Sequence, residues 1–180
     1  MNSDEELLAR ARRGEDRAFR ELVLRHEQQV RATVTGMLGA IPEAEDVALE
    51  VFVRLHQKLH EFRGEAKLST YLTRIAINLS LNEQKRQRRR RLRFTPLDQE
   101  ERPKQLIDTS ADPGRGDNLD LIRKAVACLE PDQRAVVVLR LIDGYSVRET
   151  AEILELPQGT VASRLARAQE RLRQLLKDRF

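Results

Sequence analysis

The sequence lacks tryptophan, contains 4% aromatic residues and has one cysteine, Cys128. A single cysteine cannot form an internal disulfide, so nothing in the chain requires an oxidising compartment. No segment approaches the roughly 20 apolar residues that a membrane-spanning helix needs, and the acidic N-terminal segment does not fit a secretory signal. We therefore expect a cytoplasmic protein that does not itself insert into a membrane.

The sequence also lacks the features on which most enzyme sites depend. It has no phosphate-binding glycine loop and no evident set of nucleophile, base and paired carboxylates, so we expect neither catalysis nor a cofactor. His56 and His60 are four residues apart and could share a metal ion on one helix face, but no Glu or Cys constellation completes such a site. We expect no metal, and we interpret both histidines as surface or partner-contact residues and Cys128 as a small core residue.

What is present is an apolar pattern with helical periodicity and no clear period-two alternation. Ser3 and Glu6 form a predicted capping box at the start of a first helix, with Gly14 as a possible break. A second helix is expected from about residue 27 to 38, a third beginning at Pro42, and a fourth from about residue 70, after a loop at 61–69. In the third helix Val47, Val51, Phe52, Leu55 and Leu59 form the predicted inner stripe.

Composition divides the chain into two parts. Residues 96–118 contain three prolines, two glycines and few large apolar residues, which is typical of a linker. Helical patterning resumes near Leu119, and its first helix has an apolar face with Leu121, Ile122, Ala125, Val126 and Leu129. The next helix opens at Pro131 and carries Val136, Val137, Leu139 and Leu141. The sequence therefore predicts an all-α protein with two small helical domains, 1–95 and 119–180, joined by a flexible linker, 96–118.

The C-terminal part contains a predicted helix-turn-helix at 146–173, opened by a second capping box at Ser146 and Glu149. In its last helix the inward positions are Val161, Leu165, Ala168 and Leu172. A different side of this helix carries hydroxyls and guanidiniums, groups that bind phosphates and base edges: Thr160, Ser163, Arg164, Arg167 and Arg171. This arrangement favours a helix that reads the major groove of DNA over a merely solvated arginine-rich surface.

A second basic element follows the fourth helix. Between Lys85 and Arg93 there are seven cations and no acid. Cations at this density repel one another, and DNA phosphates would relieve that repulsion. The tract extends an amphipathic helix that already carries Tyr71, Arg74, Asn78 and Asn82, so we favour DNA binding over a solvated tail. The net charge of +4 is compatible with a polyanionic partner.

Three segments together resemble the extracytoplasmic-function (ECF) sigma factors, group IV of the bacterial sigma-70 family. Residues 46–59, DVALEVFVRLHQKL, resemble the family's core-binding helix, and residues 62–89 resemble the segment that captures the melted −10 element. Residues 129–176 resemble the domain that reads the −35 element. The patterns Ile-Ala-x-Asn at 75–78 and Gly-Thr-Val-x-Ser-Arg-Leu at 159–165 are modestly specific alone and strongly specific in this order.

The resemblance implies a transcription initiation factor with region 2 at 1–95 and region 4 at 119–180. Core polymerase would be bound by Asp46, Glu50, Phe52 and Arg54, which would face the clamp helices of the largest subunit. The −10 element would be bound by Arg63, Lys67, Ser69, Tyr71, Arg74, Asn78, Asn82, Lys85, Arg86 and Arg89. The −35 element would be bound by Arg148, Thr160, Ser163, Arg164, Arg167 and Arg171.

The resemblance also implies partners: core RNA polymerase, including the flap of its second-largest subunit, promoter DNA, and a membrane-associated anti-sigma factor. We expect a factor for a stress, envelope or metal response that the anti-sigma factor holds at the inner membrane of a bacterium. The alternative is a dimeric helix-turn-helix regulator that does not act through core polymerase. Such a regulator would explain residues 119–180 equally well, but neither the residues at 70–93 nor the helix at 46–59.

Overall fold

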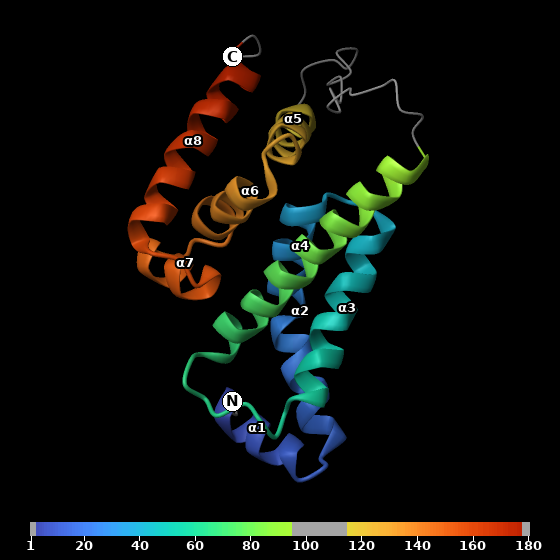
Figure 1. Ribbon diagram of the computed structural model, residues 1–180. Helices are drawn as coiled ribbons and strands as arrows, with labels where there is room; N and C mark the ends of the chain where they lie inside the picture. Colours follow the sequence, from blue (N-terminus) through green and yellow to red (C-terminus); the bar gives the residue numbers. More distant parts are fainter. Residues whose placement is uncertain (1–2, 95–114, 178–180) are drawn as a thin grey trace.

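The computed structural model describes residues 3–94 and 115–177, and every regular element in these ranges is helical, which confirms the all-α prediction. The elements are α1 (Asp4–Arg12), α2 (Asp16–Leu38), α3 (Pro42–Gln57), α4 (Leu68–Phe94), α5 (Arg115–Ala127), α6 (Pro131–Val137), the π-helical segment η1 (Val138–Ile142), α7 (Val147–Leu154) and α8 (Gln158–Leu176). We call α1–α4 the N-terminal unit and α5–α8 the C-terminal unit. In Figure 1, α2, α3 and α4 form a bundle with α1 at one end, and the C-terminal unit packs against α2 and α4.

Both predicted capping boxes are present. The Ser3 hydroxyl accepts a hydrogen bond from the Glu6 backbone N–H at 3.2 Å, and the Glu6 carboxylate accepts from the Ser3 N–H at 2.9 Å. Ser146 and Glu149 repeat this pattern at the start of α7, at 3.1 and 2.8 Å. These side chains satisfy backbone N–H groups that have no partner inside the helix, so they fix where α1 and α7 begin.

The predicted start of the second helix is wrong. Gly14 adopts φ +85°, a left-handed conformation that glycine tolerates, and α2 then begins at Asp16 rather than near residue 27. Four buried residues explain the longer helix, because Ala18, Leu22, His26 and Val30 follow one another at intervals of four. They form one continuous stripe that only an uninterrupted helix can direct into the core.

The core of the N-terminal unit is mostly aliphatic. All five residues of the predicted inner stripe are buried, although α3 ends at Gln57, before Leu59. They share one core with Leu7 and Leu8 of α1, Leu22 and Val34 of α2, and Leu72 of α4. Helix α1 is also tied to α2 by polar contacts, because Asp4 accepts from Arg25 at 2.7 Å and lies 2.9 Å from the buried His26. Polar contacts therefore add to the apolar packing that holds the short helix α1 on α2.

The C-terminal unit is built around α6 and α8. Val161 and Ala168 of α8 are fully buried, as predicted, and Leu165 and Leu172 pack beside them. Two predicted inward residues, Ile122 and Leu141, are instead exposed. The buried residues of this segment are Ala125 and Val126 near the end of α5 and Leu129 just after it. Leu141 lies in η1, whose wider turn shifts the α-helical periodicity and buries Val138 and Leu139.

The N- and C-terminal units pack against each other through an apolar cluster. Met37 and Ile77 of the N-terminal unit meet Val138, Leu139 and Ile153 of the C-terminal unit, and all five are buried. The approach is closest at Gly36, where an added Cβ would lie 3.0 and 3.1 Å from the two methyl carbons of Val138. Glycine at this position therefore lets η1 lie directly on α2. Residues 96–114 of the predicted linker, 96–118, lie outside the described residues, and α5 begins at Arg115 rather than near Leu119.

Candidate nucleic-acid interface

The outer face of α4 carries a row of amides and cations. Asn78, Asn82, Lys85 and Arg89 are spaced so that they lie along one side of the helix, and all four are exposed. The opposite side of α4 is buried through Leu72 and other apolar residues of the N-terminal core. Packing therefore fixes which face of α4 points outward, and that face holds hydrogen-bond donors and positive charge.

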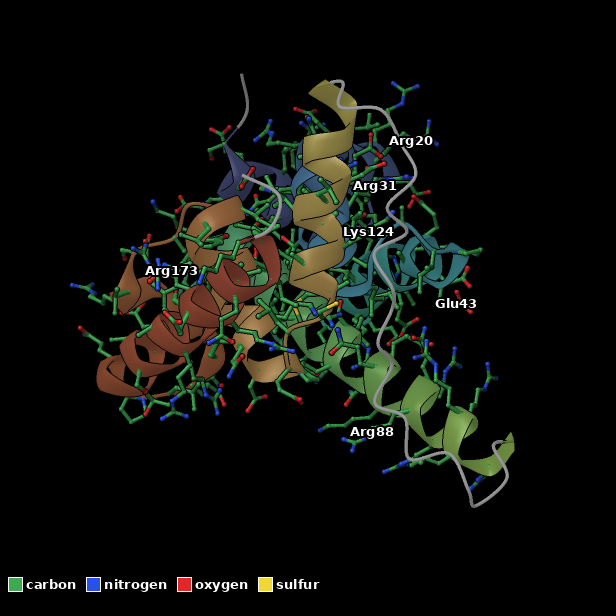
Figure 2. The ribbon with its side chains drawn as sticks, turned by 90° about the horizontal axis from the view of Figure 1, so that it is seen from above. Arg20, Arg31, Glu43, Arg88, Lys124 and Arg173 are labelled. Atoms are coloured by element: carbon green, nitrogen blue, oxygen red, sulfur yellow. The ribbon has the colours of Figure 1, made fainter. Side chains whose placement is uncertain are left out.

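The distal half of α4 extends beyond the other helices of its unit (Figure 1). This half carries the basic tract, and its cations from Lys85 to Arg93 are exposed. Figure 2 shows Arg88 on this projecting end. Glu83 pairs with Arg86, their Oε2 and Nε atoms 2.8 Å apart, at the base of the tract. The tract is thus an extended, densely positive rod, the form of charge that attracts a polyanion.

The loop before α4 leads into the predicted base-capturing segment. Arg63 and Lys67 are exposed, and Ser69 and Tyr71 are half-buried at the first turn of α4. The Tyr71 ring rests on the buried Phe62 ring, with centroids 4.8 Å apart and planes inclined by 45°. A ring that is supported on one side and partly exposed can offer its remaining surface to an unstacked base.

Arg74 has a different environment from the other cations of α4. Its guanidinium donates to the Glu152 carbonyl oxygen at 2.7 Å and pairs with the Glu155 carboxylate at 3.3 Å, both in the C-terminal unit. In this arrangement of the two units, Arg74 is engaged by protein groups rather than held open to a ligand. Release of this guanidinium from its protein partners would require the end of α7 to move away from α4.

Helix α8 presents its polar side outward, as the sequence predicts. Ser163, Arg167 and Arg171 are exposed, and the Ser163 hydroxyl donates to the Thr160 carbonyl oxygen at 3.0 Å. Arg164, in contrast, forms a 2.8 Å ion pair with Asp132 of α6, and its side chain is 26% exposed. Arg164 thus ties α8 to α6, which positions the helix.

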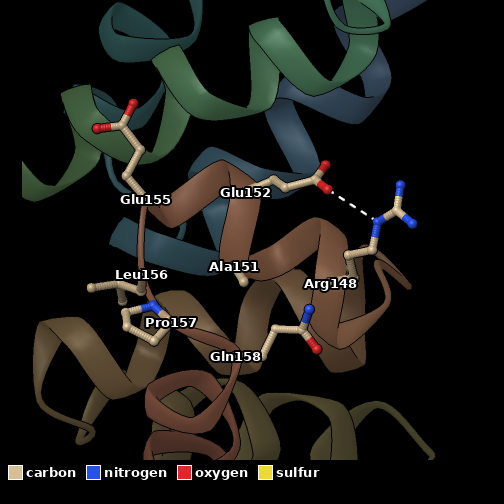
Figure 3. Close-up of a pocket in the computed structure, with 7 residues that line it drawn as sticks. All are labelled: Arg148, Ala151, Glu152, Glu155, Leu156, Pro157 and Gln158. Atoms are coloured by element: carbon tan, nitrogen blue, oxygen red, sulfur yellow. Dashed lines mark hydrogen bonds and ion pairs between the residues drawn. The ribbon is translucent and has the colours of Figure 1, made fainter.

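The turn of the helix-turn-helix is open to solvent. Glu155 adopts a left-handed conformation, φ 55°, that turns the chain sharply after α7. A shallow surface hollow beside this turn is shown in Figure 3, where Arg148 pairs with Glu152 at 3.1 Å near the mouth. The hollow is lined by Arg148, Ala151, Glu152, Glu155, Leu156, Pro157 and Gln158.

The predicted polymerase-binding residues lie on α3. Asp46, Glu50 and Arg54 are spaced by four, and the Glu50 carboxylate accepts from Arg54 Nε at 3.0 Å. Phe52 is only 7% exposed and packs in the core, which leaves little of its ring for the polymerase contact predicted for it. Leu49 and Val53, which are not among the predicted polymerase-binding residues, are 67% and 38% exposed on the outer side of α3. Both residues lie outside the predicted inner stripe of α3, and this position already indicated that they are exposed.

A polar cluster between the two units was also missed. The Tyr145 hydroxyl lies 2.8 Å from Gln29 Nε2 and 2.9 Å from Thr73 Oγ1, while Thr33 Oγ1 donates to the Asp143 carboxylate at 2.8 Å. Burial raises the pKa of Asp143 to about 6, partly opposed by the hydrogen bond from Thr33. Burial likewise raises the pKa of Tyr145. These groups fasten the turn after η1 to α2 and α4.

Among residues 3–94 and 115–177, no group of three or more His, Cys, Asp or Glu side chains is arranged to hold a metal ion. No helix in these ranges is both long and apolar enough to cross a membrane. His56 packs edge-on against Phe19, with ring centroids 5.0 Å apart. Through this contact His56 contributes to the packing of α2 against α3.

Comparison with known proteins assigns both units. Residues 22–90 match Sigma-70 region 2, and residues 119–172 match Sigma-70 region 4. The chain is 33% identical to the ECF RNA polymerase sigma factor SigM of Mycobacterium tuberculosis over 174 residues, covering 97% of this chain and 85% of SigM. The chain belongs to the ECF sigma factors.

Other relatives and structures agree. This sigma factor is 32% identical to the RNA polymerase sigma-H factor of Pseudomonas aeruginosa, over 98% of this chain and 95% of the relative. Its fold is similar to CnrH in complex with the cytosolic domain of CnrY, with a TM-score of 0.70, 26% identity, and coverage of 99% and 100%. It is also similar to the sigma factor RpoE bound to the anti-sigma factor NepR from Bartonella quintana, with a TM-score of 0.68, 26% identity, and coverage of 90% and 98%.

Proposed function

We propose that this sigma factor directs core RNA polymerase to promoters through three separate surfaces, with region 2 at 1–95 and region 4 at 119–180. The observation that carries the proposal is that one chain holds two exposed basic helix faces, on α4 and on α8. Two such faces on one chain suit promoter DNA, which carries two separate recognition elements. The chain itself contributes no catalytic step, and polymerase performs the chemistry.

The first surface binds the −10 element. The row from Asn78 to Arg89 follows the strand, with Lys85, Arg86 and Arg89 contacting phosphates and Asn78 and Asn82 contacting base edges. Arg63, Lys67, Ser69 and Tyr71 surround a base that has left the stack. Unstacking costs a few kcal/mol, and a supported ring with polar neighbours offsets that cost. Arg74 joins this surface once the C-terminal unit moves away.

The second surface binds the −35 element. Helix α8 enters the major groove with Thr160, Ser163, Arg167 and Arg171 toward the DNA, and Arg148 of α7 contacts the backbone. An arginine can bond guanine O6 and N7 at once, which makes Arg167 and Arg171 the strongest candidates for base readout. Arg164 sets the angle of α8 through Asp132.

The third surface binds core polymerase. On α3 the charged residues Asp46, Glu50 and Arg54 border the exposed Leu49 and Val53, which combines an apolar centre with a polar rim. We propose that this surface meets the clamp helices of the largest subunit. The C-terminal unit would contact the flap of the second-largest subunit.

We further propose that an anti-sigma factor controls this chain. Support comes from the fold, which is similar to a sigma factor solved with an anti-sigma factor bound. The protein would reside in the bacterial cytoplasm, held at the inner membrane by a membrane-associated anti-sigma factor until a stress, envelope or metal signal releases it.

Run-off transcription on the promoter upstream of the protein's own gene tests the proposal. Core polymerase with this chain should give a transcript with one start site, and core alone should not. Binding to core is measured on the same samples. Absence of both the transcript and core binding would refute the sigma role and favour a dimeric regulator at paired half-sites.

A further inference from the structure

Arg12, the last residue of α1, joins that helix to the turn that follows α3. Its Nε donates to the Leu59 carbonyl oxygen at 3.0 Å, and its Nη2 donates to the Phe62 carbonyl oxygen. Both carbonyls lie just past Gln57, where α3 ends and the helical hydrogen-bond pattern no longer supplies donors. A cation is also electrostatically favourable at the C-terminal end of a helix. One guanidinium therefore fixes two points of this turn.

The turn is the place where the base-capturing loop begins. Phe62 is buried, its carbonyl is held by Arg12, and its ring supports Tyr71 at 4.8 Å. At the other end of the loop, the Tyr71 N–H donates to the Lys67 carbonyl oxygen at 3.1 Å. The position of the Tyr71 ring thus depends on Phe62, and the position of Phe62 depends on Arg12.

Helix α1 is a fixed support for this contact. Asp4 binds Arg25 and His26 of α2, Leu7 and Leu8 are buried, and the Ser3 capping box closes the first turn. Helix α1 nevertheless lies before the residues that match Sigma-70 region 2, which begin at residue 22. The match to Sigma-70 region 2 therefore says nothing about what α1 does at this site.

We propose that Arg12 is a positioning residue for capture of the −10 base, acting through Phe62 on Tyr71. The inference rests on the proposed function of the 62–71 loop. Arginine suits the task because its planar fork donates to two carbonyls in a fixed geometry, whereas a lysine is a single point of charge on a flexible stem. Without the fork, Phe62 stays buried, but the turn loses the two hydrogen bonds that tie it to α1.

The test uses the full chain bound to core polymerase and forked promoter templates whose non-template −10 strand is single-stranded. Each −10 position is made abasic in turn, and the position where the wild-type holoenzyme loses most affinity is the captured base. The variants are Arg12→Ala, Arg12→Lys and the matched control Arg13→Ala. Arg13 is the next residue, is 66% exposed on its side chain and pairs only at the surface with Glu15, at 3.5 Å.

Arg12→Ala is expected to weaken binding to the intact template about tenfold, the scale of one lost base–aromatic contact. It should bind the abasic template as the wild type does, with unchanged affinity for core. Arg12→Lys should lose less affinity for the intact template, and Arg13→Ala should bind it as the wild type does. Arg12→Lys keeps the positive charge and an ammonium donor, so the comparison can be made with this variant if Arg12→Ala does not fold.

Two results would overturn the inference. Equal losses on intact and abasic templates would make Arg12 a general structural residue. A wild-type holoenzyme that is insensitive to every abasic position would remove both base capture and the role of Arg12. Specific run-off transcription would still stand in that case, so failure of the inference is distinguishable from failure of the proposed function.

Discussion

Replacing Asp143 with asparagine is expected to stabilise the protein at neutral and alkaline pH. Asp143 lies between the two units, where its carboxylate accepts a hydrogen bond from Thr33 at 2.8 Å and burial raises its pKa from 3.8 to about 6. Asparagine has nearly the same shape, can accept the same bond and has no charge to desolvate. The substitution therefore removes the free-energy cost of burying a charge and keeps the hydrogen bond from Thr33.

The magnitude follows from the pKa. A rise from 3.8 to about 6 corresponds to about 3 kcal/mol. Because the folded-state pKa is the higher one, the contribution of Asp143 to stability is fully present below pH 3.8 and is lost as pH rises through 6. Tyr145, the titratable neighbour on the same turn, has a raised pKa and stays neutral over this range. Above pH 6 the wild type thus carries the cost of a buried carboxylate, and Asp143→Asn does not.

Thermal melts of both chains at pH 4 and pH 8 measure this difference. At about 2–4 °C per kcal/mol for a chain of this size, Asp143→Asn should melt roughly 6–12 °C higher than the wild type at pH 8. The difference should nearly vanish at pH 4. The exposed Asp120→Asn is the control, with an expected change within about 0.5 kcal/mol. A variant that melts no higher at pH 8, or a gap independent of pH, would refute the reasoning.

Three further predictions concern DNA and the contact between the units. Arg167→Ala should weaken −35 duplex binding by holoenzyme by about 1–3 kcal/mol, whereas Arg173→Ala, at an exposed residue paired with Glu170, should not; similar losses would contradict base readout. Asn78→Ala should reduce permanganate reactivity of the open complex more than initial binding in a gel shift, and equal losses would indicate a structural role. Gly36→Leu should increase the radius of gyration in X-ray scattering, because the side chain would meet Val138 and overpacking costs about 1–3 kcal/mol; an unchanged radius would contradict the packing of η1 on α2.

Local signals in the sequence predicted much of the fold. A capping box needs only residues three apart, so Ser3 with Glu6 and Ser146 with Glu149 could be found without tertiary information. The buried positions Val161 and Ala168 of α8 followed from helical periodicity for the same reason. The outward rows on α4 and α8 could be predicted because each lies opposite such an apolar stripe.

Long-range contacts could not be predicted in this way. The bond between Gln29 and Tyr145 joins residues 116 positions apart, and neither residue differs from an ordinary surface residue in the sequence. The same holds for the engagement of Arg74 by α7 and for the pairing of Arg164 with Asp132. Both arginines fit a DNA-facing pattern, but only the packing of helices from elsewhere in the chain shows that each has a protein partner.

The π-helical segment η1 has a consequence for how the two units stay in register. In η1 the Asp143 N–H donates to the Val138 carbonyl oxygen, five residues back, so this turn holds one residue more than an α-helical turn. Deleting one residue from η1 would let the segment close into an ordinary α-helical turn, with little rotation of Asp143 and Tyr145. The same deletion in the regular helix α6 would rotate everything after it by about 100° about the helix axis. The wide turn is thus a place where the C-terminal unit can change length by one residue and keep both its own core and its contact with α2 and α4.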